Sequence, residues 1–253
     1  MDLNSDLAEG FGIWRLGDDE ALLDVVTSAN VACGFHAGDP STMRRVCARA
    51  VARGVAIGAQ VAYRDLAGFG RRRIDYELGE LRDDVLYQIA ALDGIAKVTG
   101  GRVRYVKPHG ALYNVAAVDS GQASAVTSAV KDYDPALPVL CQPGSVLAAE
   151  AASAGLRVVA EGFADRGYRP DGRLVPRTSP DALVTDPAVV VERAVRMAVE
   201  GSVVAVDGTV VEFGVDSLCL HGDTPGAVTL ARQVRAGLLS AGVALSPFAL
   251  SRS

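Results

Sequence analysis

Lysine is scarce in this sequence. Of its 25 basic residues only Lys97, Lys107 and Lys131 are lysine, and none of them follows a glycine. A Walker-type nucleotide loop has a glycine directly before its lysine, so that loop is absent. The motifs H-E-x-x-H and G-x-S-x-G are absent as well. The common P-loop, zinc-protease and α/β-hydrolase sites are therefore excluded.

Cysteine is also scarce, and its four positions are scattered. The cysteines form no C-x-x-C pair and lie in apolar surroundings, which is typical of reduced cysteines in the cytosol. The chain begins MDLNSDLAEG, with acids where a secretory signal has positive charge, and no apolar run approaches the ~20 residues of a membrane span. We expect a cytoplasmic protein with no membrane partner. The cysteines are Cys33, Cys47, Cys141 and Cys219.

Basic charge is not concentrated in any segment. The 25 basic and 30 acidic residues give a net charge of -5, and the basic residues are scattered along the chain. Nucleic-acid binders carry a basic patch or stripe, so we expect no nucleic-acid partner. The hydrophobic content of 49% and the absence of a long linker predict one domain, residues 1–253.

The hydrophobic pattern predicts an α/β fold. Short apolar runs alternate with longer stretches of helical periodicity, as in parallel strands joined by helices. In residues 203–213 two β-branched runs flank Asp207-Gly208, which predicts a small antiparallel hairpin. The seven predicted parallel strands cover residues 1–6, 30–35, 55–59, 103–107, 137–141, 157–161 and 216–220. The predicted helices include residues 18–29, 41–53, 77–98, 187–199 and 225–240.

All three histidines follow predicted strands, in loops that contain glycine. One loop histidine alone often bonds only to backbone, but three of three at strand exits indicate a shared site. In barrels and open α/β sheets alike, ligands bind beyond the carboxyl ends of the strands. We therefore expect side chains from the different strand exits to face a single cleft. These residues are Asp6, His36, Lys107, His109, Glu161 and His221.

Carboxylates gather in the same strand-exit loops. A general acid and a general base require two titratable groups in different environments. Asp39 and Asp223 precede Pro or Thr-Pro at predicted helix starts, so helix capping explains them as well as catalysis does. Asp6 has no capping role, and we expect Asp6 or Glu9 to act as the general base for a water molecule.

Basic residues lie near the carboxyl ends of several predicted strands. Lys107 ends an apolar strand and precedes Pro108, which predicts a cation oriented toward the site. We expect Lys107 and His109 to stabilise an oxyanion or a phosphate. The segment GFGRRR, residues 68–73, and Arg166 add anion-binding groups. Two of the three arginines in GFGRRR are expected to be only a solvated charge run.

Eight segments of the chain carry a family pattern. They are DLNSDLAEGFG (2–12), SANVACGFHAGDP (28–40), GFGRR (68–72), YQIAAL (87–92), VKPHGALYN (106–114), EGFADRGY (161–168), LVPR (174–177) and CLHGD (219–223). In this order and spacing they closely resemble the LamB/YcsF family over nearly the whole chain. The resemblance implies a seven-stranded βα barrel of the glycoside hydrolase/deacetylase type, which matches the strand count.

The resemblance also implies an activity. The family is the A subunit of prokaryotic ATP-dependent 5-oxoprolinase, which opens the lactam of 5-oxoproline to L-glutamate with partner subunits B and C. A lactam amide is a poor electrophile, and phosphorylation of its oxygen by ATP would make the ring carbon attackable. Because the Walker loop is absent, ATP binds either on the partner subunits or across an interface with them, or in a loop nest of this chain. A homo-oligomer is left open.

The candidate residues fall into two groups. The candidate catalytic residues are Asp6, Glu9, Lys107 and His109. The candidate substrate-binding residues are His36, Asn114, Glu161, Asp165, Arg166, Arg177, His221 and Asp223.

The sequence departs from the family pattern at four positions. The pattern reads DLNCD-x-GE and GAHP, where this chain has Ser5, Ala8, Gln60 and Val61. Deacetylases on this barrel hold a divalent metal with one Asp and two His, and Gln60 is a poor zinc ligand, so no metal site is predicted. Two alternatives stay open: a metal-dependent deacetylase or other amide hydrolase on the same barrel, and a binding subunit without catalysis.

Overall fold

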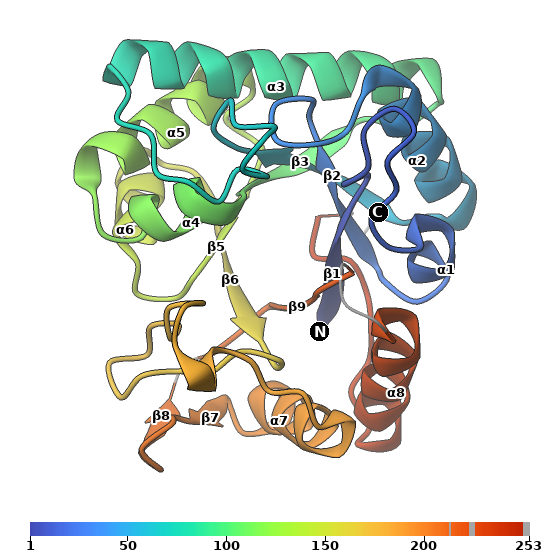
Figure 1. Cartoon of the computed structure of the whole chain (residues 1–253), viewed down its shortest axis with the longest axis vertical. Coiled ribbons are helices and arrows are strands. Elements are labelled where there is room, and N and C mark those ends of the chain that lie inside the picture. Colours follow the sequence, from blue (N-terminus) through green and yellow to red (C-terminus); the bar gives the residue numbers. More distant parts are fainter. Residues whose placement is uncertain (213, 223–225, 250–253) are drawn as a thin grey trace.

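Seven parallel strands close into a barrel in the order β1-β2-β3-β4-β5-β6-β9. The fold comes from a computed structural model that describes residues 1–212, 214–222 and 226–249. The helices lie around the strands (Figure 1). The barrel expected from the family resemblance is confirmed. Its strands are β1 (Asp2–Leu7), β2 (Ser28–Ala32), β3 (Ala56–Val61), β4 (Val103–Pro108), β5 (Val139–Cys141), β6 (Val158–Phe163) and β9 (Ser217–Leu220).

Helices connect consecutive strands in most of the crossovers. Helices α4 to α6 were not among the helices predicted above, and they follow β4 and β5. No helix in the described ranges combines the length and the apolar character needed to cross a bilayer. The helices are α1 (Asp19–Leu23), α2 (Pro40–Arg53), α3 (Leu78–Val98), α4 (Gly110–Ala116), α5 (Ser120–Tyr133), α6 (Val146–Ser153), the 3-10 helix η1 (Pro180–Ala182), α7 (Pro187–Val199) and α8 (Ala227–Ser240).

The predicted helix over residues 18–29 is wrong in its second half. Asp18 caps helix α1, which ends at Leu23, and residues 28–32 form strand β2. The β-branched run of residues 25–27 disfavours a helix, and β2 bonds to neighbours on both sides, β1 and β3. The strand also ends earlier than the predicted residue 35, because Gly34 has a φ of +97° that no strand continues.

The predicted hairpin is confirmed. Strands β7 (Ser202–Val204) and β8 (Val210–Glu212) pair antiparallel in a separate two-stranded sheet, and Gly208 in the turn has a φ of 89°. Phe213, the last residue of the predicted excursion, lies outside the described residues. The hairpin precedes β9 and lies outside the barrel (Figure 1).

Polar side chains fill much of the barrel interior. On β1, Asp2, Asn4 and Asp6 occupy alternate positions, so all three point to one side of the strand. The Asn30 amide donates to Asn4 (2.7 Å) and to Asp6 (2.8 Å), and the Tyr105 hydroxyl donates to Asn30 (2.6 Å). Each buried polar group in this column therefore has a partner, as burial requires.

Gly58 on β3 makes room for the Tyr105 ring inside the barrel. A Cβ atom at position 58 would lie 2.1 Å from the ring. Phe248 packs on the other part of the same ring, with centroids 4.8 Å apart, and its carbonyl accepts from Arg157. The C-terminal segment thus covers the amino ends of the strands, and the carboxyl ends remain for a ligand.

Candidate active site

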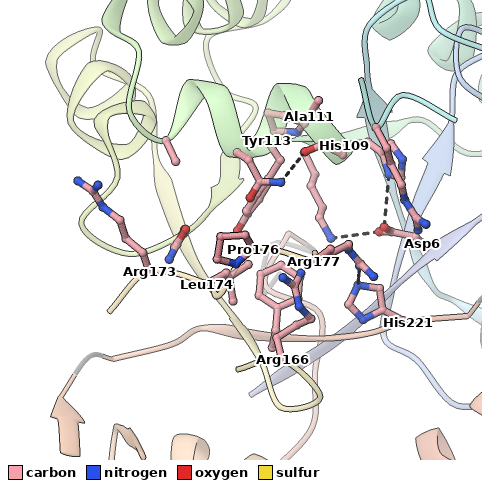
Figure 2. Close-up of a pocket in the computed structure, with 18 of the residues that line it drawn as sticks. Asp6, His109, Ala111, Tyr113, Arg166, Arg173, Leu174, Pro176, Arg177 and His221 are labelled. Carbon is pink, nitrogen blue, oxygen red and sulfur yellow. Dashed lines mark hydrogen bonds and ion pairs between the residues drawn. The ribbon is translucent and has the colours of Figure 1, made fainter. Parts of the chain in front are cut away.

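A pocket of about 490 Å³ opens at the carboxyl ends of the strands (Figure 2). Charged residues line its inner end, and apolar residues of helix α4 and of the loop after β6 line its sides. This is the position at which barrels bind their ligands. Its lining includes Asp6, Glu9, Arg71, Lys107, His109, Tyr113, Asn114, Phe163, Arg166, Arg173, Leu174, Val175, Pro176, Arg177 and His221.

The floor of the pocket is a buried group of Asp6, Lys107 and Glu161. The Lys107 Nζ lies 3.1 Å from Asp6 Oδ1 and 2.7 Å from Glu161 Oε1. It also contacts the Asn4 side-chain oxygen (3.5 Å) and the Cys219 sulfur (3.3 Å). Strands β1, β4, β6 and β9 supply these groups, so backbone pairing fixes their positions.

The two floor carboxylates have opposite electrostatic environments. Burial acts to raise the pKa of Asp6, but the Lys107 ammonium holds it well below its usual range. Burial raises the pKa of Glu161, and Lys107 offsets only part of that effect. Burial also opposes the charge of Lys107, yet Asp6, Cys219 and Glu161 keep its pKa well above the usual lysine value. Asp6 and Lys107 are therefore charged at neutral pH, and Asp6 is the carboxylate that reaches the pocket.

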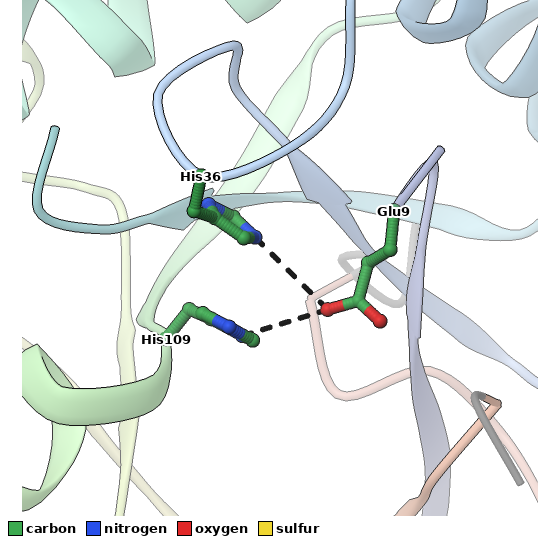
Figure 3. Close-up of side chains that lie close together, drawn as sticks. All are labelled: Glu9, His36 and His109. Carbon is green, nitrogen blue, oxygen red and sulfur yellow. Dashed lines mark ion pairs between the residues drawn. The ribbon is translucent and has the colours of Figure 1, made fainter. Parts of the chain in front are cut away.

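Beside the floor lies a histidine layer of Glu9, His36, Gln60 and His109. The His36 and His109 rings stack with centroids 4.0 Å apart, and the side chains of Glu9, His36 and His109 converge in Figure 3. The Gln60 Nε2 donates to Glu9 Oε1 (3.3 Å) and to His109 Nδ1 (3.1 Å), while its oxygen accepts from His36 Nε2 (3.2 Å). One amide thus connects all three neighbours.

The hydrogen bonds of Gln60 fix the protons of both histidines. The His109 Nε2 lies 3.0 Å from the Phe69 carbonyl and donates to it, so His109 Nδ1 carries a lone pair. Burial lowers the pKa of His36 well below its usual value, so His36 is neutral. His109 Nδ1 lies 3.6 Å from Asp6 Oδ2 and 3.5 Å from Glu9 Oε1. Two carboxylate acceptors, Asp6 and Glu9, therefore flank His109 at the edge of the pocket.

Glu9, His36 and His109 have the residue types of a metal centre. Glu9, His36 and His109 offer ligand atoms that lie within 4.8 Å of one another, close enough for a divalent ion. The Gln60 amide, however, hydrogen-bonds each of these atoms. Its nitrogen, which is not a metal ligand, faces two of them. As they are arranged, the residues do not fit an ion, and we assign them to a hydrogen-bonded layer.

The wall of the pocket opposite helix α4 carries a chain of three residues, Asp165, His221 and Arg177. His221 Nδ1 lies 2.5 Å from Asp165 Oδ2, and Arg177 Nη2 lies 2.7 Å from His221 Nε2. Burial acts to raise the pKa of Asp165, but His221, Arg166 and Arg177 lower it overall, so Asp165 is ionised. Asp165 and Arg177 belong to the long loop between β6 and α7, and His221 directly follows β9.

The structure brings eight of the predicted site residues to the pocket. Three others, His36, Glu161 and Asp165, lie behind its lining. Asp223 is outside the described residues. The eight lining residues are Asp6, Glu9, Lys107, His109, Asn114, Arg166, Arg177 and His221.

Two of the lining residues use their polar atoms for the protein itself. Arg166 donates to the main-chain carbonyls of Ala182 (3.0 Å) and Val175 (2.7 Å), which holds the loop after β6 in shape. The Asn114 amide donates to the Gly110 carbonyl one helical turn earlier. Both shape the pocket wall through these bonds.

The capping and surface interpretations are confirmed for three residues. Asp39 accepts from the backbone N–H groups of Ser41 and Thr42 at the start of α2. Arg72 pairs with Asp65 and Arg73 with Asp75, whereas Arg71 lines the pocket.

Sequence reasoning missed Gln60 and Tyr113. In the sequence Gln60 is distinguished only as a poor metal ligand, and its signal is that it directly follows the predicted strand of residues 55–59. Tyr113 lies one turn into the helix that follows His109, and burial, together with the nearby Glu161 carboxylate, raises its pKa well above the usual value. No signal in a single sequence marks it apart from a core aromatic.

Comparisons with known proteins give one consistent result. The A subunit of 5-oxoprolinase from Mycobacterium avium (strain 104) is 60% identical over 248 residues, which cover 98% of this chain and 98% of that protein. The A subunit of 5-oxoprolinase from Streptomyces coelicolor is 60% identical over 249 residues, covering 98% of this chain and 100% of that protein.

A solved structure and a family model agree with these relatives. The lactam utilization protein from Thermus thermophilus superposes with a TM-score of 0.94 at 45% identity, covering 98% of this chain and 99% of that one. The model of the LamB/YcsF family matches residues 1–253. The chain therefore belongs to the LamB/YcsF family.

Proposed function

We propose that this chain is the A subunit of an ATP-dependent 5-oxoprolinase and that its pocket hydrolyses the activated lactam of 5-oxoproline. The observation that supports the proposal most is the floor, where an ionised Asp6 and a protonated Lys107 lie together at the inner end of the pocket. Relatives that carry the name of this 5-oxoprolinase component, at 60% identity over almost their full length, support the substrate.

The reaction needs both activation and a nucleophile. Transfer of the terminal phosphoryl group of ATP to the lactam oxygen makes the ring carbon electrophilic. A water molecule then adds to that carbon, the carbon–nitrogen bond breaks as the nitrogen takes a proton, and a second water releases phosphate. The products are L-glutamate, ADP and phosphate. This chain has no Walker loop, so ATP binds on the partner subunits B and C, across an interface with them, or in a loop nest of this chain.

The floor supplies the proton chemistry, and the histidine layer positions the groups beside it. We assign Asp6 Oδ2 to bind the attacking water and to take its proton, because the single lone pair of His109 Nδ1, 3.6 Å from Asp6 Oδ2, already accepts from Gln60. The sequence suggested His109 as an oxyanion donor, but its N–H is used by the Phe69 carbonyl. Lys107 therefore stabilises the negative charge that develops on the reacting oxygens. Gln60, which also donates to Glu9, holds His109 in the tautomer that accepts at Nδ1 and so fixes the ring beside Asp6.

Reconstitution tests the proposal. The chain is mixed with subunits B and C, ATP and 5-oxoproline, and the formation of glutamate is followed. The wild-type complex is expected to convert 5-oxoproline to glutamate, and Asp6→Asn to lower kcat about 10²-fold. The chain without its partners is expected to show little activity. A Lys107→Met variant is compared with Lys97→Met as its control. The Lys97 side chain is 64% exposed on helix α3, where its ammonium pairs with Asp93. Tight binding of 5-oxoproline without any turnover by the complex would instead identify a binding subunit.

A further inference from the structure

We infer that Arg177 binds the carboxylate of the lactam acid and that Asp165 and His221 are the positioning residues that hold it in place. The inference rests on the proposed function, which supplies a substrate with a carboxylate. It assigns recognition of this group to the wall, away from the floor where the ring would open.

The direction of each hydrogen bond along the wall follows from chemistry. A guanidinium can only donate, so His221 Nε2 must accept from Arg177. The proton of the neutral His221 ring is then on Nδ1 and is donated to Asp165. The ionised Asp165 thus selects the tautomer of His221, and His221 orients Arg177. The same logic applies wherever a carboxylate fixes a histidine that must accept at its other nitrogen.

Arg177 lacks a carboxylate partner in the part of the chain that the structure describes, where its guanidinium makes only the bond to His221. Other arginines near the barrel mouth are paired: Arg72 with Asp65 and Arg64 with Asp84. A guanidinium has five N–H donors and matches a carboxylate in bidentate geometry. An oriented arginine with donors to spare, lining a pocket, is therefore suited to a carboxylate from outside the chain.

The surroundings of Arg177 match the rest of a small lactam. Leu174, Val175 and Pro176 directly precede it in the pocket lining, and the Phe163 ring stacks on His221 with centroids 6.0 Å apart. These apolar groups suit the methylene carbons of a five-membered ring. Figure 2 shows Arg177 and His221 on the side of the pocket where Asp6 lies. One small molecule can thus be held by its carboxylate while its carbonyl faces the floor.

A substrate pair tests the assignment. The reconstituted enzyme is assayed with 5-oxoproline and with 2-pyrrolidone, the same lactam without the carboxylate. Wild type is expected to prefer 5-oxoproline. Arg177→Met is expected to raise KM for 5-oxoproline about 10- to 100-fold, with kcat changed less than about threefold and KM for 2-pyrrolidone unchanged. Arg169→Met is the matched control, because Arg169 lies in the same loop, pairs with Asp171 and does not line the pocket.

The positioning role has its own readout. His221→Phe is expected to raise KM for 5-oxoproline nearly as much as Arg177→Met, whereas His221→Gln, whose oxygen can accept from Arg177, restores most of the affinity. Adding Arg177→Met to His221→Phe should then cost little more, because the pair acts as a unit. A purely structural His221 would give equal losses for both substrates and no rescue by glutamine.

The outcomes separate this inference from the proposed function. If wild type converts neither lactam, the proposed function fails and the inference with it. If wild type prefers 5-oxoproline and Arg177→Met keeps that preference, the proposed function stands and the inference is overturned. An equal loss of activity with both lactams in Arg177→Met would assign Arg177 to the phosphoryl group instead. If only Arg173→Met lost the preference for 5-oxoproline, the carboxylate would bind at Arg173, further along the loop. Both results overturn the inference.

Discussion

The floor and the wall of the pocket hold charge in different ways. The floor places Asp6, Lys107 and Glu161 on three barrel strands, with side-chain exposures of 13%, 3% and 0%. The wall places Asp165 and Arg177 on a loop and His221 at a strand exit. Each floor charge is held by backbone pairing and by a direct ionic contact. In the wall, the exposed Arg177 is held through a histidine.

The difference indicates a division of work between scaffold and loop. Strand residues keep their positions when a ligand leaves, which suits groups that must meet a reacting atom. A loop residue can change without disturbing the barrel, which suits a group that selects the substrate. Four experiments break or sharpen this comparison.

Removal of the floor cation has the largest expected effect. Lys107→Met leaves Asp6 and Glu161 buried without their shared cation, so kcat should fall by about 10²–10³-fold and the free energy of unfolding by about 3–5 kcal/mol. Glutamate assays and urea unfolding measure the two losses. Lys107→Met/Glu161→Gln should recover part of the stability, because it removes one uncompensated charge, but none of the activity. Equal stability of the single and double variants would contradict the ionic account of the floor.

A change beneath the floor tests its support. Gly58→Ala puts a Cβ atom 2.1 Å from the Tyr105 ring, which also anchors Asn30 below Asp6. We expect a loss of at least about 3 kcal/mol in urea unfolding, from overpacking of a core that cannot open. Gly79→Ala on helix α3 is the control, since nothing lies within 4 Å of its added Cβ. A stable, active Gly58→Ala protein would show that the ring can move.

The pH dependence of stability should have opposite signs in the two regions. The pKa of Glu161 is raised, so its ionisation costs folded-state stability, and wild type loses stability relative to Glu161→Gln as pH rises above about 4.5. The pKa of Asp165 is lowered, so its stabilisation is complete above the usual aspartate value and declines as pH falls below about 4. Urea unfolding of wild type, Glu161→Gln and Asp165→Asn between pH 3 and 8 measures the sign of each change in stability. Slopes of the same sign would contradict the assigned environments.

The smallest expected effect is the dependence of the kinetics on salt, which should differ between the wall and the floor. Arg177 is exposed, so raising the ionic strength from about 0.05 M to about 0.5 M should raise KM for 5-oxoproline several-fold. The buried floor should leave kcat nearly constant. Arg177→Met should show a flatter dependence of KM on salt than wild type does. A kcat that falls with salt as steeply as KM rises would place the screened charge in the floor.

The sequence alone predicted which loops form the site because strand exits in a parallel barrel converge whatever their spacing. It could not predict which side chains reach the pocket. Glu161 lies within β6, and its direction depends on the register with β5 and β9. His36 lies in a loop whose path depends on the left-handed Gly34 and Gly38. Both were expected in the lining, and both lie behind it.

The histidine layer shows a second limit. Gln60 carries no charge, and a single sequence offers no reason to connect it with Glu9, His36 and His109 before the barrel brings them together. The role of its amide oxygen and nitrogen is determined by the side chains that they contact in the folded barrel. Arg166 is the opposite case. Its charge suggested that it binds a ligand, but it donates its hydrogen bonds to main-chain carbonyls in its own loop.

The closure of the barrel between β1 and β9 has a consequence for synthesis on the ribosome. Strand β1 pairs with residues 217–220, so it must wait for almost the whole chain before its second neighbour exists. During that interval it is an exposed edge, the kind of strand on which nascent chains aggregate. The face that will turn inward carries Asp2, Asn4 and Asp6, which remain hydrated while the edge is open. The polar barrel interior therefore protects the unfinished protein as well as the finished pocket.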